Sequence, residues 1–269
     1  MIPAPVDYVR PPSLEEALEA LGEPEARVLA GGQSLVPALK LRLARPSLLV
    51  DVGGLDLRGI SRENGGIRVG ALATWDDLLG SEELDTPGLS AIRECAAGIG
   101  DLQVRNLGTF GGGLAHADPA SDMPAVALAL GMQISVRSTS GERKIGADEL
   151  FLGPFTTTLE PGDLITEVLV PEPPSGAGSA YVSVENPASG FALAGAAALV
   201  TPDGTVTVAV TGVSYRPLLL TAGEPEEALA EIEISEDRAA PAEYRRQLAA
   251  VVVRRAVELA RNRVEEAAQ

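Results

Sequence analysis

The stretch TFGGGLAHADPASDMP, residues 109–124, carries most of the information about this chain. A threonine is followed by three glycines, Gly111–Gly113, and the signals Asp118-Pro119 and Ser121-Asp122 then predict the start of an apolar helix. The shorter stretch AGGQSL, residues 30–35, lies between an expected strand and an expected helix. Glycines let a backbone approach a ligand closely and turn its N–H groups toward an anion. Each stretch alone is equally consistent with a tight structural turn.

Neither stretch matches a familiar nucleotide motif, because G-x-G-x-x-G and GK[ST] are both missing. Taken together they suit a dinucleotide whose pyrophosphate is held from two sides, with the Thr109 hydroxyl as a further donor. Asp122 has two interpretations: it stabilises the start of a helix, or it accepts hydrogen bonds from ribose hydroxyls. The sequence therefore predicts a two-part phosphate cradle without choosing between these roles.

The composition is that of an ordinary globular protein with an acidic surface. The 269 residues are 45% hydrophobic and 22% charged, and the formal net charge is −17. The negative electrostatic field of such a protein repels nucleic acid and anionic membrane surfaces. A phosphate ligand must then be bound by backbone N–H groups rather than by bulk positive charge.

The chain has a single cysteine, Cys95, and a single histidine, His116. One thiol cannot form an internal disulfide or hold an iron–sulfur cluster, and the pair does not make a zinc site. No G-x-S-x-G elbow accompanies His116, which argues against a Ser-His-Asp hydrolase. We expect no metal site and no side chain acting as a general acid or base. The N-terminus lacks a signal segment and no run is long enough to span a bilayer, which predicts a cytoplasmic protein.

The order of expected elements suggests three units. Residues 1–56 are predicted as strand, loop, helix and strand, with Ser13 and Gly22 at the two ends of the helix. Residues 57–172 are predicted as a second unit of helices and strands, with a capping box at Thr74 and Asp77 and a hairpin that turns at residues 140–141. The Pro-, Gly- and Ser-rich segment 171–179 predicts a linker into a small α+β domain, 173–269. That domain is expected to contain antiparallel strands over 181–185, 192–200 and 205–214, with a turn at Pro202–Gly204 between the last two. A closing helix is expected over 241–267, and its predicted apolar face is Tyr244, Leu248, Val251, Val252, Ala256 and Leu259.

The two glycine stretches, with QVRNL before the second and an α+β C-terminal part, resemble the FAD-binding medium subunit of the molybdenum hydroxylases. This family includes the medium subunit of aerobic carbon monoxide dehydrogenase and the flavin domain of xanthine dehydrogenase. The resemblance runs from about Pro3 to about Arg263. It implies a vanillyl-alcohol-oxidase-type (PCMH-like) α+β fold, in which two subdomains bind FAD and a third domain covers the isoalloxazine.

The resemblance also implies roles for individual residues. The first stretch matches the first pyrophosphate loop, the second stretch matches the second, and Asp122 matches the acid that binds the ribose of the adenosine half. Ile99, Ala115 and Ile165 match apolar contacts, for which ordinary core packing is an equal explanation. The full set of expected FAD-binding residues is Ala30, Gly31, Gly32, Gln33, Ser34, Leu35, Ile99, Thr109, Gly111, Gly112, Gly113, Ala115, Asp122 and Ile165.

The chain departs from the family pattern in YVSVENPASGFA, residues 181–192. Ser183 stands where the family has a lysine and Gly190 where it has an aspartate, both toward the flavin end. A missing lysine removes a cation that favours a reduced, anionic flavin. We expect a lowered flavin reduction potential or a different partner.

The resemblance implies an FAD-dependent oxidoreductase subunit. Electrons would pass from a molybdenum-cofactor large subunit to a [2Fe-2S] small subunit and then to the FAD of this chain. The flavin would pass them on to NAD⁺, a quinone or oxygen. Two alternatives stay open: a stand-alone flavoenzyme with its own small-molecule substrate, and a non-catalytic interaction subunit that has lost flavin chemistry. Retention of FAD and co-purification with iron distinguish the three.

Overall fold

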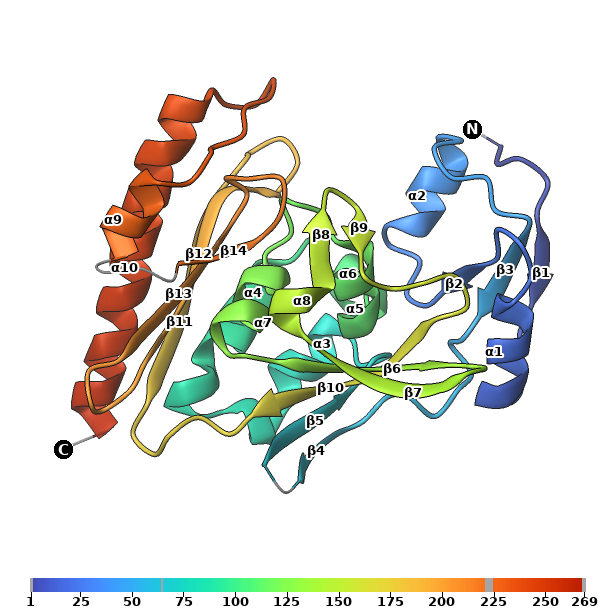
Figure 1. Cartoon of the computed structure of the whole chain (residues 1–269), viewed down its shortest axis with the longest axis horizontal. Coiled ribbons are helices and arrows are strands. Elements are labelled where there is room, and N and C mark those ends of the chain that lie inside the picture. Colours follow the sequence, from blue (N-terminus) through green and yellow to red (C-terminus); the bar gives the residue numbers. More distant parts are fainter. Residues whose placement is uncertain (1, 64, 221–224, 268–269) are drawn as a thin grey trace.

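The computed structural model describes residues 2–63, 65–220 and 225–267, which fold around three larger sheets (Figure 1). The first sheet is parallel, in the order β1-β3-β2, and its strands enclose a small core with α1. Its elements are β1 (Asp7–Val9), α1 (Leu14–Leu21), β2 (Arg27–Leu29), α2 (Leu35–Lys40) and β3 (Leu48–Asp51).

Helix α1 begins and ends where the sequence predicts. The Ser13 hydroxyl accepts a hydrogen bond from the Glu16 backbone N–H at 3.2 Å, which satisfies one free donor of the first turn. Gly22 ends the helix. The apolar face of α1 is buried against β3, so this unit has a core of its own.

The second sheet is antiparallel, in the order β4-β5-β10-β6-β7. Strand β10 is central and pairs with β5 and β6, and the predicted β6–β7 hairpin is confirmed. The strands are β4 (Ile60–Glu63), β5 (Gly66–Gly70), β6 (Gln133–Ser138), β7 (Gly141–Gly146) and β10 (Leu164–Pro171), with a small two-stranded sheet of β8 (Phe151–Gly153) and β9 (Thr156–Thr157).

The helices of this unit lie between β5 and β6 in sequence, with α8 after β7. Thr74 and Asp77 form the predicted capping box at the start of α3: the Asp77 N–H donates to the Thr74 hydroxyl at 3.2 Å, and the Thr74 N–H donates to the Asp77 carboxylate at 2.7 Å. The helical segments are α3 (Trp75–Gly80), η1 (Glu82–Leu84), η2 (Pro87–Leu89), α4 (Ser90–Gly98), α5 (Leu102–Leu107), α6 (Phe110–His116), α7 (Met123–Ala129) and α8 (Ala147–Leu150).

The glycine-rich stretch after Thr109 is a helix, so the expectation of a loop there is wrong. Helix α6 begins at Phe110, and the Thr109 hydroxyl accepts the Gly112 N–H at 3.3 Å as its N-cap. Three consecutive glycines disfavour a helix by their backbone entropy. Tertiary packing offsets that cost, because Phe110 and Leu114 are fully buried in the main core.

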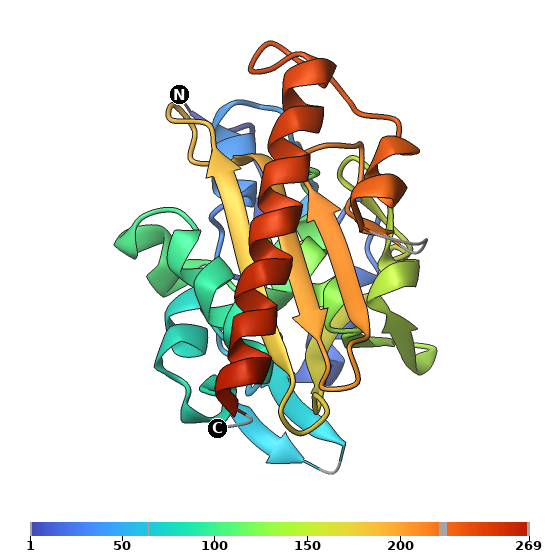
Figure 2. The same ribbon diagram turned by 90° about the vertical axis from the view of Figure 1, so that its left-hand side faces the viewer.

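The third sheet is antiparallel, in the order β11-β12-β13-β14. Helix α10 covers one face (Figure 2), and α4 and α7 pack on the other. The predicted strands, the turn at Pro202–Gly204 and the closing helix are confirmed. The elements are β11 (Gly178–Glu185), β12 (Ala192–Val200), β13 (Val206–Thr211), β14 (Leu218–Leu220), α9 (Pro225–Ala230) and α10 (Ala242–Ala267).

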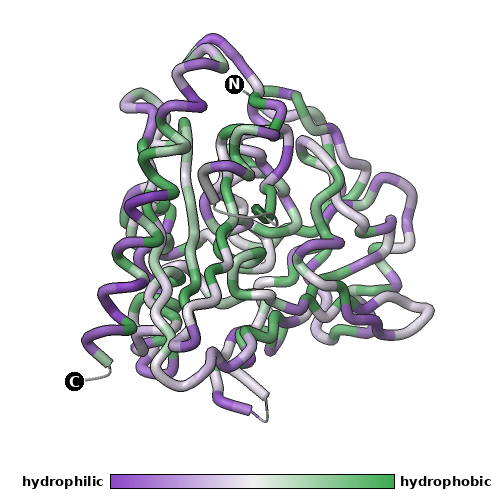
Figure 3. The backbone as a smooth tube through the Cα atoms, turned by 60° about the vertical axis from the view of Figure 1, so that its left-hand side comes forward, coloured by the Kyte–Doolittle hydropathy of each residue, from purple (hydrophilic) through white to green (hydrophobic). Residues whose placement is uncertain are grey.

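The buried side of α10 differs from the predicted face. Tyr244 and Leu259 are 46% and 41% exposed, whereas Arg245 is buried. The Arg245 guanidinium donates to the Leu193 carbonyl oxygen at 3.2 Å and forms an ion pair with Asp237 at 2.7 Å. These partners make burial of a charged residue tolerable, and the helix is rotated accordingly. Hydrophilic and hydrophobic colours alternate along α10 (Figure 3).

No helix in the described ranges is both long and apolar enough to cross a membrane. Each predicted unit contains one of the three larger sheets. The boundaries at 56/57 and 172/173 stay predictions.

Candidate functional site

The two glycine stretches meet at Gly31. A Cβ atom built on Gly31 would lie 1.9 Å from the Leu107 carbonyl oxygen and 2.9 Å from the Cα of Gly108. On the other side of the contact, a Cβ on Gly112 would lie 3.9 Å from the Cβ of Ala30. The segment after β2 therefore packs directly on the backbone between α5 and α6, as the two-part site requires.

The first stretch presents a row of free backbone donors. Within the residues that the structure describes, the N–H groups of Gly31, Gly32, Gln33, Ser34 and Leu35 donate to no protein acceptor. Gly32 has a φ of +70°, and the Gln33 side chain braces the turn by donating to the Gly31 carbonyl oxygen at 3.3 Å. Successive unpaired amides form an anion-binding concavity, and this observation favours the cradle over a merely structural turn.

The second stretch contributes shape more than donors. The Phe110 and Gly111 N–H groups donate to the carbonyl oxygens of Ala73 and Ala71 at 2.8 and 2.9 Å. A Cβ on Gly111 would lie 2.6 Å from the Cβ of Ala71, and one on Gly113 would lie 2.7 Å from the Trp75 ring. These two glycines are therefore required for close packing.

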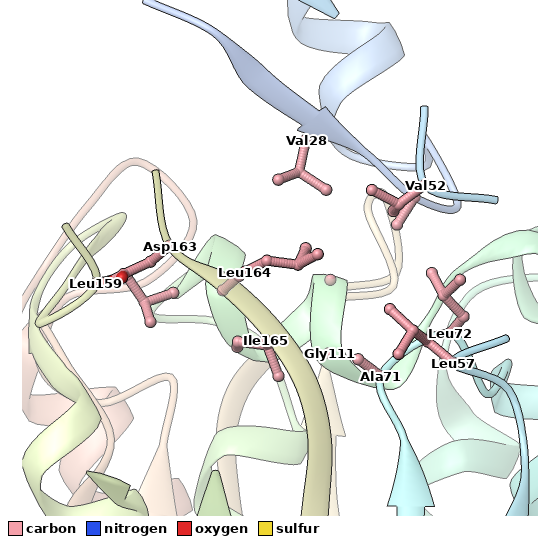
Figure 4. A pocket seen from close by; sticks show the side chains of 13 residues that line it. Val28, Val52, Leu57, Ala71, Leu72, Gly111, Leu159, Asp163, Leu164 and Ile165 are labelled. Atoms are coloured by element: carbon pink, nitrogen blue, oxygen red, sulfur yellow. The ribbon is translucent and has the colours of Figure 1, made fainter. Parts of the chain in front are cut away.

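An apolar cleft lies between the first two units (Figure 4). It contains about 410 Å³ of space between the protein atoms, part of it open to solvent. Five expected FAD-binding residues line it: Ala30, Gly111, Gly112, Ala115 and Ile165. Gly112 and Ala115 are exposed toward solvent on α6, which leaves room for a ligand beside the helix. The free amides suit the phosphates of a dinucleotide, and the apolar lining of the cleft suits a flat ring.

Several lining residues were not predicted. They stand near the ends of strands or in the segments that follow them, and the apolar pattern alone does not show that they converge. Ligands commonly bind at the carboxyl ends of parallel strands, and this rule could have identified Val28 near the end of β2 and Val52 just after β3. The missed residues are Val28, Val52, Leu57, Ala71, Leu72, Leu159, Asp163 and Leu164.

Ile99 and Asp122 do not line this cleft. Ile99 follows α4, and its carbonyl oxygen accepts a hydrogen bond from Arg105 at 3.3 Å. Asp122 precedes α7, where the Tyr181 hydroxyl of β11 donates to its carboxylate. A ligand that uses the cleft and also reaches these residues must be extended. Their roles stay predictions.

Asp122 occupies an unusual electrostatic environment. Burial raises the pKa of its carboxyl to about 6, and the charges of Glu185 and Asp118 act in the same direction. The hydrogen bond from Tyr181 opposes this shift without cancelling it. Burial together with the Asp122 charge raises the pKa of Tyr181 well above its ordinary value.

The departures at Ser183 and Gly190 have different structural settings. Gly190 lies in the β11–β12 turn with a φ of +74°, and its N–H donates to the Asn186 carbonyl oxygen at 2.8 Å. Glycine suits that conformation, so the turn explains its presence. Ser183 follows Tyr181 by two positions on β11 and therefore shares its face of the sheet, near Asp122.

Asp122→Asn should change the pH dependence of stability in FAD-free protein. The folded state holds the Asp122 proton more tightly than the unfolded chain, so this carboxyl lowers stability as pH rises from about 4 to about 6. The variant lacks that penalty, which amounts to at most about 3 kcal/mol. Urea unfolding at about pH 4.5 and pH 8 measures the free energy of unfolding of both proteins. The stability of the variant relative to the parent should be higher at pH 8 than at pH 4.5. An equal difference at both pH values contradicts the raised pKa.

Comparison with known proteins identifies the class. Residues 4–173 match the family model described as the FAD binding domain in molybdopterin dehydrogenase. That match covers more than half of the chain, and it coincides with the cradle and the cleft. The chain belongs to this family, binds FAD and is an FAD-dependent oxidoreductase subunit.

The carbon monoxide dehydrogenase medium chain of Afipia carboxidovorans is 38% identical over 98% of this chain and 99% of its own length. The glyceraldehyde dehydrogenase medium chain of Sulfolobus acidocaldarius is 40% identical, covering 81% of this chain and 79% of its own. Among solved structures, carbon monoxide dehydrogenase from Hydrogenophaga pseudoflava superposes with a TM-score of 0.92 at 33% identity, over 98% of this chain and 99% of that one. The fold predicted from the resemblance is confirmed.

Proposed function

We propose that this chain is the electron-transferring FAD subunit of a molybdenum hydroxylase complex. A molybdenum-cofactor subunit supplies electrons to a [2Fe-2S] subunit. The FAD subunit receives them from there and passes them to an acceptor. The observation that carries the proposal is the row of five unpaired amides at Gly31–Leu35 beside the apolar cleft. The family match and the full-length similarity to medium chains support the same function.

Each part of the site has a binding task. The amides of Gly31–Leu35 hold the pyrophosphate, because backbone dipoles bind an anion without adding a cation to an acidic protein. The cleft walls enclose a flat ring and exclude water from it. Bound FAD supplies reversible electron transfer, and the protein supplies grip, orientation and electrostatic tuning.

A stand-alone flavoenzyme is the second candidate, and Ser183 is the observation that favours it. A cytoplasmic location also stays a prediction. Purification from the native host by a tag on this chain tests the assignment. We expect a yellow complex containing iron and molybdenum. A yellow protein without either metal, which acts on its own small-molecule substrate, indicates the stand-alone enzyme. A colourless protein contradicts both candidates.

Ser183→Lys should raise the flavin reduction potential, by roughly a few tens of millivolts. The added ammonium lies on the Tyr181 face of β11, where the charged groups acting on Asp122 are carboxylates. It should also lower the Asp122 pKa from about 6. Potentiometric titration of both proteins measures the first effect, with Ser183→Met as a control for side-chain size. An unchanged potential rejects the electrostatic explanation.

A further inference from the structure

Asp163 is the ionisable residue among those that line the cleft. Its side chain is only 3% exposed. Figure 4 shows it beside Leu159, on the side of the cleft away from Leu57 and Leu72. A buried carboxylate in an apolar wall requires a partner.

That partner is Arg143, on β7. Its two terminal nitrogens donate to both carboxylate oxygens of Asp163, with Nη1 2.9 Å from Oδ1. This paired geometry is directional as well as strong. The Glu160 N–H donates to the same carboxylate at 2.6 Å. Burial raises the pKa of Asp163, but these hydrogen bonds outweigh it and hold the pKa below its ordinary value, so the carboxylate stays ionised.

The same residues shape a tight turn. The Asp163 N–H donates to the Glu160 carbonyl oxygen at 3.0 Å, and Gly162 has a φ of +89°. A proline followed by a glycine of positive φ is typical of a type II turn. Arg143 belongs to β7, the edge strand of the second sheet, so the ion pair ties the turn at the entry into β10 to that strand.

The entry into β10 joins the two cores that flank the cleft. Leu164 packs in the core of the first unit, together with Leu18 and Val50, whereas Ile165 packs in the main core. Leu164 and Ile165 both line the cleft. A shift of the turn therefore moves one wall of the cleft relative to Gly112 on α6.

We propose that the Arg143–Asp163 ion pair is a positioning device for FAD, an inference that rests on the proposed function. It holds the wall formed by residues 159–165 at a fixed separation from α6 and so sets how tightly the cleft encloses the cofactor. Arg143 does not line the cleft and acts on FAD only through Asp163 and the turn.

Arg143→Met in the full chain tests this role, because it removes the paired donors and keeps a long side chain. FAD titration of the FAD-free protein should show FAD affinity reduced by about 10-fold. This loss lies between the effects typical of breaking an exposed ion pair and a buried one. The visible circular dichroism of the bound flavin should change as well. Arg143→Lys should bind FAD more tightly than Arg143→Met and less tightly than the parent. Asp163→Asn should reduce FAD affinity less in the Arg143→Met background than in the parent, because the ion pair is already broken there.

Arg93→Met is the matched control, since it breaks the ion pair of Arg93 with Asp85 away from the cleft. It should leave FAD affinity unchanged. Equal affinity and equal dichroism in Arg143→Met and the parent overturn the positioning role. So does an affinity loss matched by Arg93→Met. If Arg143→Met does not fold, Arg143→Lys decides alone: affinity and dichroism identical to the parent overturn the role. Failure of the parent itself to bind FAD contradicts the proposed function instead.

Discussion

Gly31→Ala should reduce FAD affinity by at least about 100-fold, the largest effect that we expect from one added carbon atom. The new Cβ would lie 1.9 Å from the Leu107 carbonyl oxygen and 2.7 Å from its carbonyl carbon. Both atoms belong to backbone, which cannot rotate away. The first stretch must therefore move off α5, which separates the free amides from the cleft. Fluorescence titration with FAD measures the loss.

The same variant should lower stability by about 1–3 kcal/mol, as overpacking commonly does. Gly80→Ala is the matched control, because a Cβ on Gly80 meets nothing within 4 Å. It should change neither FAD affinity nor stability appreciably. Parent-like affinity in Gly31→Ala contradicts the close contact between the two stretches.

Gly112→Val should abolish retention of the flavin during purification. Gly112 is exposed on α6 and lines the cleft, so a branched side chain enters the space of the ligand. Its Cβ would also lie 2.6 Å from the Thr109 hydroxyl oxygen, the N-cap of α6. Loss of that cap should lower stability by about 1 kcal/mol.

The ratio of flavin absorbance to protein absorbance in the purified protein measures flavin retention. Thr109→Ala separates the two causes, since it removes the cap without adding an atom to the cleft. Gly112→Val should lose far more flavin than Thr109→Ala. Parent-like colour in Gly112→Val shows that α6 is wrongly placed in the site.

Local chemistry made much of the architecture predictable. Ser13 begins α1, Thr74 with Asp77 begins α3, and the turn at Pro202–Gly204 joins β12 to β13. Each signal acts within a few residues, so it survives whatever the rest of the chain does. The two glycine stretches likewise predicted the family, which the match over residues 4–173 confirms.

Other features depend on contacts between distant segments. The predicted face of α10 was right at Val252 and Ala256 but wrong at Tyr244 and Leu259. The buried side includes Arg245 instead, whose partners Leu193, Gly212 and Asp237 come from distant segments that periodicity cannot show. The glycines of residues 111–113 were expected in a loop, but burial of Phe110 and Leu114 makes the segment helical. Two of the three glycines are needed for packing on Ala71 and Trp75.

The sequence by itself determined the family, the cofactor and the positions of the glycine stretches, because turns, caps and close backbone approach depend on residue type. Only the tertiary structure decided which N–H groups are free, which side chains line the cleft, and that Arg143 supports its wall through Asp163. Those properties arise where segments far apart in the chain meet, and no local pattern specifies them.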